Sequence, residues 1–377
     1  MISIIIAGDY CPKERVAQLI DRDNYEVIFK QVKPLLNQCD YSIVNFECPV
    51  CSSQGCEIKK AGPPLKCTDK AVLALKYAGF DCVTLANNHF YDQGEVGVRE
   101  TINSLESAEI DHVGGGFNIN DASATLYKTI NGKTLAIINC CEHEFSIATE
   151  STGGSNPLNP IRQYYAIKEA KKMSDYVLMI VHGGIEHYQY PTQRMVETYR
   201  FFIDAGADAV VNHHQHCFSG CERYKGKPIF YGLGNFCFDW SARSTPLWEE
   251  GYMVKLIIKD NLVDYILYPY NQNGSEVGIR FKDEVSFIEW KTRFDAITDV
   301  IADKKLLYEK YNTLLNNTER LYSANLTPYT GRLALALYMR HLLPICLPPK
   351  KLRVLLNMLM CESHYERMIR MLKNYSK

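Results

Sequence analysis

Five short apolar segments of this chain each end in a polar side chain that can bind a metal ion. The segments and their polar residues are Ser3–Ala7 with Asp9, Tyr41–Phe46 with Glu47, Asp81–Ala86 with Asn88, Tyr176–Val181 with His182, and Asp208–Val211 with His214. Helical patterns separate most of the segments, and repeated strand–helix–strand units predict an α/β fold with a largely parallel sheet. Ligands bind beyond the carboxyl ends of the strands in such sheets. We therefore expect the five polar side chains to meet at one site.

The chemistry of these side chains favours a divalent metal. Carboxylate oxygens, an amide oxygen and imidazoles suit Mn²⁺, Zn²⁺, Fe²⁺ or Mg²⁺. The run His213-His214-Gln215-His216 adds two more histidines to the set. Each residue alone has a simpler explanation, since Asp9 can cap a helix and Asn88 can form a turn. Their convergence from five strands favours a site for one or two ions.

The remaining patterns predict further helices and strands. We expect helices at about residues 12–36, 68–79, 95–108 and 192–205, and late strands at 228–231, 252–258 and 262–268. The dipeptide Asn131-Gly132 lies between two strand patterns and is typical of a tight hairpin. These late antiparallel strands predict mixed sheets.

The pattern changes after Asp283 and becomes wholly helical. We expect one domain at residues 1–283 and a helical extension at residues 284–377. From Lys291 to the end the chain has fifteen Lys and Arg against seven Asp and Glu. A basic tail can bind an acidic membrane or nucleic acid, although a solvated helical face is the commoner reason for such a composition.

Six short motifs follow one another in a familiar order. They are Gly8-Asp9, Asn45-Phe46-Glu47, Leu85–His89 followed by Asp92 and Gly94, His182–Glu186, Asn212–His216, and Tyr231–Phe236. The series resembles the CapA family of capsule and poly-γ-glutamate synthesis proteins, whose members look like distant metallophosphoesterases. The resemblance covers about residues 1–270. It implies a metallophosphoesterase-like layered α/β fold with mixed sheets.

The resemblance also implies roles for single residues. Asp9 and His216 would hold one metal, Glu47 would bridge, and Asn88, His182 and His214 would hold the second. His89 would donate a proton or stabilise an oxyanion, and Glu186 would orient a ligand or act as a base. Asn87 and Asn235 would bind substrate.

One departure from the metallophosphoesterase pattern concerns the first motif. Such enzymes usually carry Asp-x-His there, whereas this chain has Asp9-Tyr10-Cys11. The first metal is then one ligand short, unless Cys11 serves as a soft ligand. Glu47 also stands where the enzymes usually have Asp, which changes the metal spacing.

The function implied is a metal-dependent hydrolase of cell-surface polymer biosynthesis, acting on a phosphoester or a γ-glutamyl amide. One alternative is a non-catalytic accessory subunit of a polymer synthase that retains the metal cage. Another is a nucleic-acid phosphoesterase, but the net charge of −1 argues against a nucleic-acid partner. The expected partners are the polymer or its precursor and other capsule-synthesis proteins, with peripheral membrane contact through the basic helices as a further option.

No signal peptide or membrane-spanning run is visible in the sequence, so we expect a cytoplasmic protein. Its fourteen cysteines should then be thiols or metal ligands rather than disulfides. Cys48, Cys51, Cys56 and Cys67 lie close together, and both a zinc site and loose loop thiols remain open for them.

Overall fold

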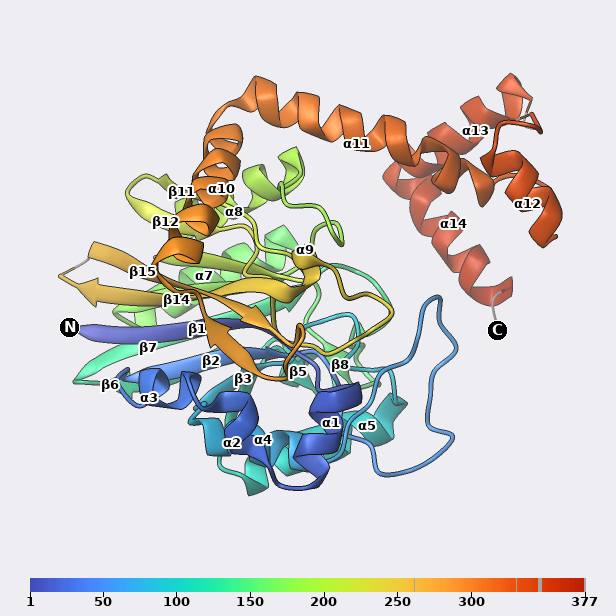
Figure 1. Cartoon of the computed structure of the whole chain (residues 1–377). Helices are drawn as coiled ribbons and strands as arrows, with labels where there is room; N and C mark the ends of the chain where they lie inside the picture. The colour runs from blue at the N-terminus through green and yellow to red at the C-terminus, as the bar shows by residue number, and fades with distance from the viewer. Residues whose placement is uncertain (261, 330, 345–347, 376–377) are drawn as a thin grey trace. The chain divides into compact units, whose positions relative to one another are not determined.

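The computed structural model describes residues 1–260, 262–329, 331–344 and 348–375 of the chain (Figure 1). Its contacts divide into two compact units, Met1–Tyr308 and Glu309–Lys377. The first helix after residue 283 belongs to the first unit. The predicted boundary between a domain at residues 1–283 and an extension at residues 284–377 stays a prediction.

Two mixed sheets form the centre of the first unit. The first sheet contains β1 (Ile2–Tyr10), β2 (Tyr41–Phe46), β3 (Cys82–Thr84), β4 (Asp111–Val113), β13 (Asn235–Cys237), β14 (Glu250–Lys259), β15 (Leu262–Gln272) and β16 (Ile279–Phe281). The second contains β6 (Leu126–Ile130), β7 (Lys133–Cys141), β9 (Tyr176–His182), β10 (Ala209–His213), β11 (Cys221–Tyr224) and β12 (Lys227–Phe230). A small third sheet pairs β5 (Gly115–Gly116) with β8 (Gly154–Ser155).

The strand order brings distant parts of the sequence together. The first sheet runs β16-β15-β14-β1-β2-β3-β4, with β13 also paired to β1, and the second runs β11-β12-β10-β9-β7-β6. Strands β1, β2, β3 and β4 are parallel to one another, as are β7, β9, β10 and β12. The predicted hairpin is confirmed, because β6 and β7 pair antiparallel around Asn131 and Gly132, which both have positive φ.

Fourteen helices are described. They are α1 (Glu14–Asp21), α2 (Tyr25–Phe29), α3 (Val32–Leu36), α4 (Lys70–Ala78), α5 (Gly94–Ser107), α6 (Ile119–Ala122), α7 (Pro160–Met173), α8 (Gln193–Ala205), α9 (Pro246–Glu249), α10 (Glu284–Ala302), α11 (Lys304–Ala324), α12 (Arg332–Met339), α13 (Pro349–Met360) and α14 (Glu362–Tyr375). The helical stretch predicted at about residues 12–36 consists of three short helices, α1 to α3. Asp23 adopts a left-handed φ of 56°, which ends the first of three short helices.

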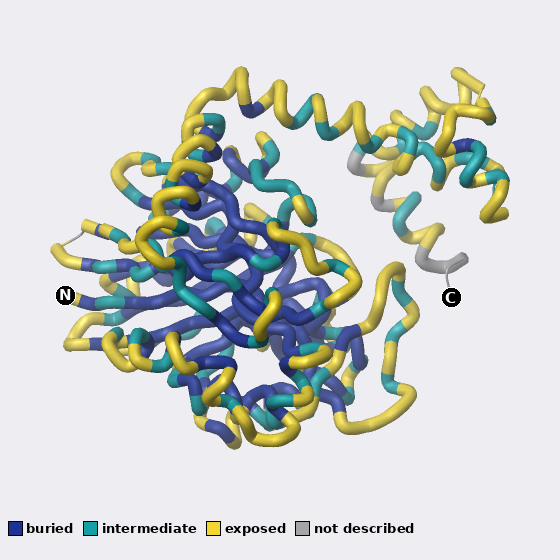
Figure 2. The backbone as a smooth tube through the Cα atoms, viewed as in Figure 1, coloured by how far each residue is buried: buried dark blue, intermediate teal, exposed yellow. Residues whose placement is uncertain are grey.

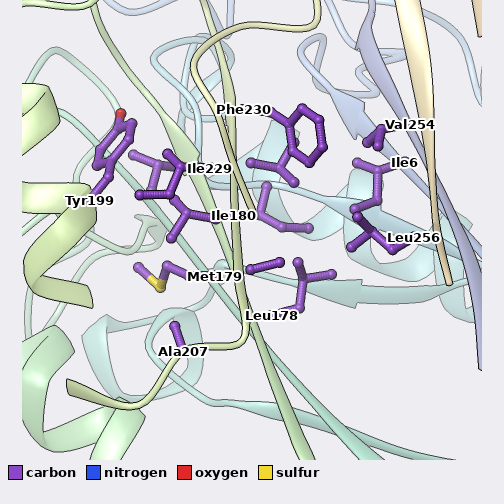
Figure 3. Packing of buried hydrophobic residues seen from close by; sticks show 14 of the residues in the cluster. Ile6, Leu178, Met179, Ile180, Tyr199, Ala207, Ile229, Phe230, Val254 and Leu256 are labelled. Atoms are coloured by element: carbon purple, nitrogen blue, oxygen red, sulfur yellow. The ribbon is translucent and has the colours of Figure 1, made fainter. Parts of the chain in front are cut away.

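The alternation of side chains along β1 explains the layering. Ile4 and Ile6 join the apolar core between the two sheets, whereas Ile5 and Ala7 face the core beneath α1 to α5. Figure 3 shows Ile6 and Leu256 of the first sheet opposite Phe230 of the second. Helices α7 and α8 pack on the outer face of the second sheet. The first unit is therefore a layered α/β fold with mixed sheets, and the helices that follow it agree with the predicted fold class.

The helices after β16 divide between the two units. Trp290 and Phe294 of α10 are buried against Tyr252 of β14, so α10 completes the core of the first unit. The second unit contains most of α11 and all of α12 to α14. None of the described helices is long and apolar enough to cross a membrane. Residues 330, 345–347 and 376–377 of the predicted extension lie outside the described residues.

Candidate metal centre

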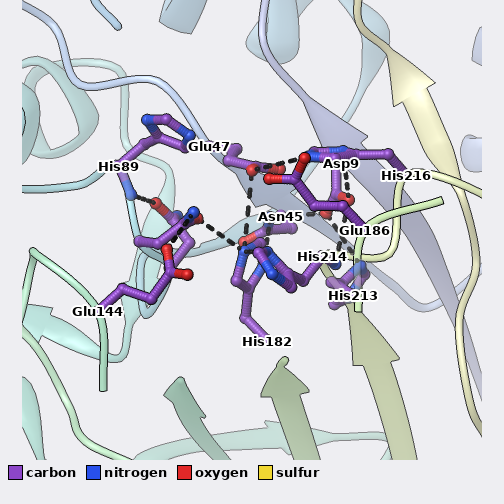
Figure 4. A network of polar contacts seen from close by, with 12 residues as sticks. Asp9, Asn45, Glu47, His89, Glu144, His182, Glu186, His213, His214 and His216 are labelled. Atoms are coloured by element: carbon purple, nitrogen blue, oxygen red, sulfur yellow. Dashed lines mark hydrogen bonds and ion pairs between the residues drawn. The ribbon is translucent and has the colours of Figure 1, made fainter. Parts of the chain in front are cut away.

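The carboxyl ends of the parallel strands bring the predicted site residues together (Figure 4). Asp9 lies near the end of β1 and pairs in register with Asn45 of β2 on one side and Asn235 of β13 on the other. The backbones meet very closely here. A Cβ atom on Gly8 would lie 1.9 Å from the carbonyl oxygen of Gly234, so only glycine fits beside Asp9.

Glu47 lies at the centre of the site and is fully buried. Neither of its carboxylate oxygens has a hydrogen-bond partner among the described residues. Its Oε1 lies 3.6 Å from Nε2 of His216 and 3.8 Å from Nε2 of His182. Burial, together with the nearby charges of Asp9 and Glu186, raises the pKa of Glu47 well above its usual value. A buried carboxylate without donors is costly, and a bound cation would satisfy it.

Asp9 is also buried but has two donors. Its Oδ1 accepts a hydrogen bond of 2.7 Å from the side-chain amide of Asn45, and its Oδ2 accepts one of 3.2 Å from the backbone N–H of His214. Burial raises the pKa of Asp9 to about 7, because these two hydrogen bonds only partly offset the loss of water.

His182 and His214 supply two imidazoles from the second sheet. Nδ1 of His214 lies 3.1 Å from Nε2 of His182, which also lies 3.1 Å from Oδ1 of Asn88. Burial lowers the pKa of both histidines, and the surrounding histidines lower that of His182 further. Both rings are therefore held in the neutral form that binds metal ions.

His214 and His216 are placed by an uncommon backbone conformation. Their φ angles are 94° and 54°, in the left-handed region that residues with a side chain seldom adopt. Nδ1 of His216 lies 2.9 Å from Oδ1 of Asn235, and this contact fixes the ring with Nε2 toward Glu47. Burial lowers the pKa of His216 to about 3, with a further contribution from His214. Strain of this kind is typical of functional sites.

Two groups of side chains have their ligand atoms within 4.8 Å of one another. One contains Glu47, His214 and His216, and the other contains Asp9, Glu47 and His182. Glu47 belongs to both, so it is the one carboxylate that can serve two ions. The grouping pairs Glu47 with different partners from those that the family resemblance implied. The donor set, two carboxylates and three neutral imidazoles, fits one or two divalent ions.

Cysteine contributes to neither of these groups among the described residues. Cys11 is buried in the apolar core beneath the helices, as is Cys48. No disulfide joins any of the thirteen described cysteines.

His89 lies beside the candidate metal ligands in a buried charged network. Its Nδ1 is 2.6 Å from Oδ2 of Asp92 and 3.2 Å from Nζ of Lys60. Nζ of Lys60 also donates to Oδ1 of Asp92 at 2.5 Å, and the lysine side chain is 2% exposed. Because Nδ1 makes these contacts, Nε2 is the ring nitrogen left for a ligand.

The other predicted residues have protein partners. Glu186 accepts a hydrogen bond of 2.7 Å from Arg243. Burial opposes ionisation of Glu186, but His216 and Arg243 together lower its pKa to about 2. The side-chain amide of Asn87 donates to the carbonyl of Phe46, and Asn235 bonds to His216 as described. Both asparagines are fully buried, and their predicted substrate contacts stay a prediction.

Sequence reasoning assigned no individual role to four residues of the site, Asn45, Lys60, Glu144 and His213, although its motifs included Asn45 and His213. Asn45 precedes Glu47 by two positions, and strand periodicity was the signal that could have placed both on one face. Glu144 accepts a hydrogen bond of 2.8 Å from Asn88. His213 is buried with its Nδ1 3.5 Å from Oδ1 of Asp9, and burial lowers its pKa to about 3.

Comparison with known proteins gives a family match. The model of the family described as bacterial capsule synthesis protein PGA_cap matches residues 3–240. Capsule biosynthesis protein CapA of Bacillus anthracis is 32% identical over 69% of this chain and 64% of its own length, so the chain spans just under two thirds of that relative. PGA biosynthesis protein CapA of Bacillus subtilis is 32% identical over 69% of each chain. A hypothetical protein of Thermus thermophilus, known from its crystal structure, is 15% identical with a TM-score of 0.47, over 72% of this chain and 100% of its own.

Proposed function

This chain belongs to the bacterial capsule synthesis protein PGA_cap family, and we propose that it is a metal-dependent hydrolase of capsule or poly-γ-glutamate biosynthesis. The bond that it cleaves is a phosphoester or a γ-glutamyl amide. Its proposed partners are the polymer or its precursor and other proteins of capsule synthesis, and its proposed location is the cytoplasm.

The buried carboxylate of Glu47 carries the proposal. Both of its oxygens lack a donor within the part of the chain that the structure describes, and three neutral imidazoles and Asp9 surround it. Such an arrangement is unfavourable without a cation and favourable with one. Asp9, Glu47, His182, His214 and His216 would hold the ion or ions, with Asn88 beside His182. A divalent ion at this position supplies Lewis-acid chemistry for hydrolysis.

His89 is the residue that we assign to proton transfer. The carboxylate of Asp92 and the ammonium of Lys60 both contact Nδ1 of His89 and fix the orientation of the ring. Nε2 is then the atom that donates a proton to the leaving group or stabilises a developing negative charge.

Glu186 is better suited to orienting a ligand than to acting as a base. Its pKa of about 2 makes the carboxylate a weak proton acceptor at neutral pH. Its hydrogen bond to Arg243 holds the guanidinium, 32% exposed, beside the candidate centre. Arg243 can then bind an anionic group of the substrate while Glu186 keeps it in place.

A non-catalytic accessory role is the second candidate, and Cys11 is the observation that favours it. The thiol that replaces the usual first-motif histidine lies in the apolar core and belongs to neither ligand group. A site with one ligand fewer binds its ion more weakly, so the cage can serve binding or stability without turnover.

Metal content and turnover test the proposal together. Protein purified without chelator should hold one to two equivalents of divalent metal by elemental analysis. It should then hydrolyse either a nitrophenyl phosphate ester or a γ-glutamyl anilide. Glu47→Gln should lose the metal and the activity, because the amide cannot serve as a shared anionic ligand.

Glu95→Gln is the matched control, since Glu95 is exposed and its carboxylate accepts hydrogen bonds from the hydroxyl of Tyr91 and the backbone N–H of Gly153. It should keep both metal and turnover. Metal without turnover on any substrate of either class would favour the accessory role. Absence of metal after incubation with Mn²⁺ or Zn²⁺ would overturn both candidates.

A further inference from the structure

The second unit has an unusual distribution of charge. Residues 309–377 contain eleven Lys and Arg against four Asp and Glu. From Arg320 to Cys361 the sequence carries six Lys or Arg and not one Asp or Glu. A solvated helical face normally carries both positive and negative side chains. A segment of this length that has cations but no acidic residue therefore points to an anionic partner.

Most described residues of the same unit are exposed (Figure 2), and many of the exposed residues are large and apolar. Helix α13 has no buried residue, and Leu359 and Met360 on it are 60% and 72% exposed. The exposed apolar residues of α12 to α14 and the turn after α12 are Leu333, Leu335, Met339, Leu342, Leu352, Val354, Leu356, Leu359, Met360, Tyr365, Met371 and Leu372. Single exposed leucines are ordinary, but a small helical unit with this many is typical of a binding surface.

Helix α13 carries both cations and exposed apolar side chains. Lys350, Lys351 and Arg353 lie in the first turns of α13, and all three are exposed. Leu356 and Leu359 follow three residues apart and lie on neighbouring positions of one helical face. Basic residues beside exposed leucines are the composition of helices that lie in the plane of a membrane interface.

We propose that the second unit docks on the surface of an anionic lipid bilayer through α13 and the cations that accompany it. Headgroups would bind the lysines and arginines, and the acyl region would take up the leucines and methionines. This is contact with one leaflet, consistent with the lack of a spanning helix among the described residues. The inference does not depend on the proposed hydrolase activity.

Charge decides between the bilayer and other occupants of this surface. Pairing with a second copy would bring two sets of cations together, which repel. An acidic protein would match the cations but not a surface with this many aliphatic side chains. A bilayer that contains anionic lipid matches both features at once.

Vesicle sedimentation with the full chain tests the proposal. The protein should sediment with vesicles of phosphatidylcholine and phosphatidylglycerol but not with phosphatidylcholine alone, and high salt should release it. The triple variant Lys350→Gln, Lys351→Gln, Arg353→Gln should bind the anionic vesicles on the order of 100-fold more weakly, at about fivefold for each cation near the surface. The double variant Leu356→Gln, Leu359→Gln should also weaken binding. If binding depended on charge alone, this double variant would bind as the parent does.

The matched control removes three exposed lysines of the first unit, Lys30→Gln, Lys172→Gln and Lys259→Gln, and should bind as the parent does. Circular dichroism establishes that each variant is folded. The proposal is overturned if the triple α13 variant binds like the parent, or if both vesicle types bind equally. It is also overturned if no vesicle binds and the protein instead forms dimers at rising concentration, since the apolar face then serves self-association.

Discussion

Nδ1 of His214 lies 3.1 Å from Nε2 of His182, and both rings are buried at the candidate metal centre. Nε2 of His182 has a second neighbour at the same distance, the side-chain oxygen of Asn88. Burial keeps both rings neutral, so only one N–H is available where these atoms meet. A cation could replace that hydrogen and be bound by both rings.

His214→Ala should therefore weaken metal binding at least tenfold, and we expect about 10-fold to 100-fold. The alanine removes one imidazole from the group that contains Glu47 and His216. Equilibrium dialysis with Mn²⁺ or Zn²⁺ measures the change. His112→Ala is the control, because this half-buried histidine lies on β4 and belongs to neither ligand group. Equal affinities of the two variants would contradict the proposed ligand set.

Metal binding should release protons from the carboxylates at slightly acidic pH. The pKa of Asp9 is about 7, so without a cation this group is mostly protonated at pH 6. In the metal-free protein, the stability that Asp9 contributes is complete below its unfolded pKa and is lost as the pH rises through about 7. Metal binds the ionised form and should reverse that trend.

The affinity for metal should accordingly rise by about tenfold per pH unit up to about pH 7 for each proton displaced. His216, with a pKa of about 3, stays neutral throughout this range and adds nothing to the slope. Calorimetric titration in two buffers with different ionisation enthalpies counts the protons released. An affinity independent of pH between 5 and 7 would contradict the buried carboxylate as a ligand.

Lys60→Met should lower turnover and leave metal content unchanged. The methionine keeps the apolar stem of Lys60 but removes the ammonium that contacts Asp92 and His89. We expect kcat to fall about 10-fold to 100-fold, less than the roughly 100-fold to 10,000-fold that proton transfer contributes, because His89 itself remains. Lys60→Arg retains the charge and should restore part of the rate. Loss of metal in Lys60→Met would show that Lys60 supports the metal ligands rather than proton transfer by His89.

Glu250→Gln should destabilise the fold at neutral pH. Glu250 accepts from Lys282 at 2.8 Å and from two nitrogens of Arg293 at 2.7 Å, and so ties α10 to β14. Burial alone raises the pKa of Glu250, but these hydrogen bonds outweigh it and lower the pKa. Since Arg293 is half exposed, we expect a loss of about 2 kcal/mol, below the usual cost of breaking a fully buried pair.

The effect of Glu250→Gln should depend on pH in one direction. A group with a lowered pKa contributes stability above its unfolded pKa and loses it as the pH falls through the folded value. The difference between parent and variant in urea unfolding should shrink as the pH falls below the ordinary pKa of glutamate. Glu276→Gln is the control, because Glu276 pairs with Arg280 on the surface and should show little change at any pH.

The sequence predicted the strands and their polar ends because both are local features. Asp9, Glu47 and His182 each follow an apolar run, and parallel strands bring such positions together whatever the intervening segments do. Strand β13 is only three residues long and went unpredicted, since its pairing with β1 depends on a partner more than two hundred positions away. Short strands carry too few residues for periodicity to show.

Contacts made by loops were the part that could not be predicted. Lys60 belongs to a segment without regular structure, and nothing in its neighbourhood indicates that its ammonium is buried against Asp92. The two candidate ligand groups that share Glu47 have the same origin, because they depend on the backbone turns at His214 and His216. Distances between such side-chain atoms depend on the whole fold rather than on the spacing of the residues along the sequence.

The position of β1 between β2 and β14 has a consequence for the newly made chain on the ribosome. β2 follows β1 within about thirty residues, but β14 begins only at Glu250. At a synthesis rate of about 5–20 residues per second, the edge of β1 that pairs with β14 stays without that partner for tens of seconds. Asp9 and Glu47 are translated early, yet the strand β14 that pairs with β1 emerges only with the last third of the polypeptide. The candidate ligand group of Glu47, His214 and His216 is complete only after both histidines have been synthesised.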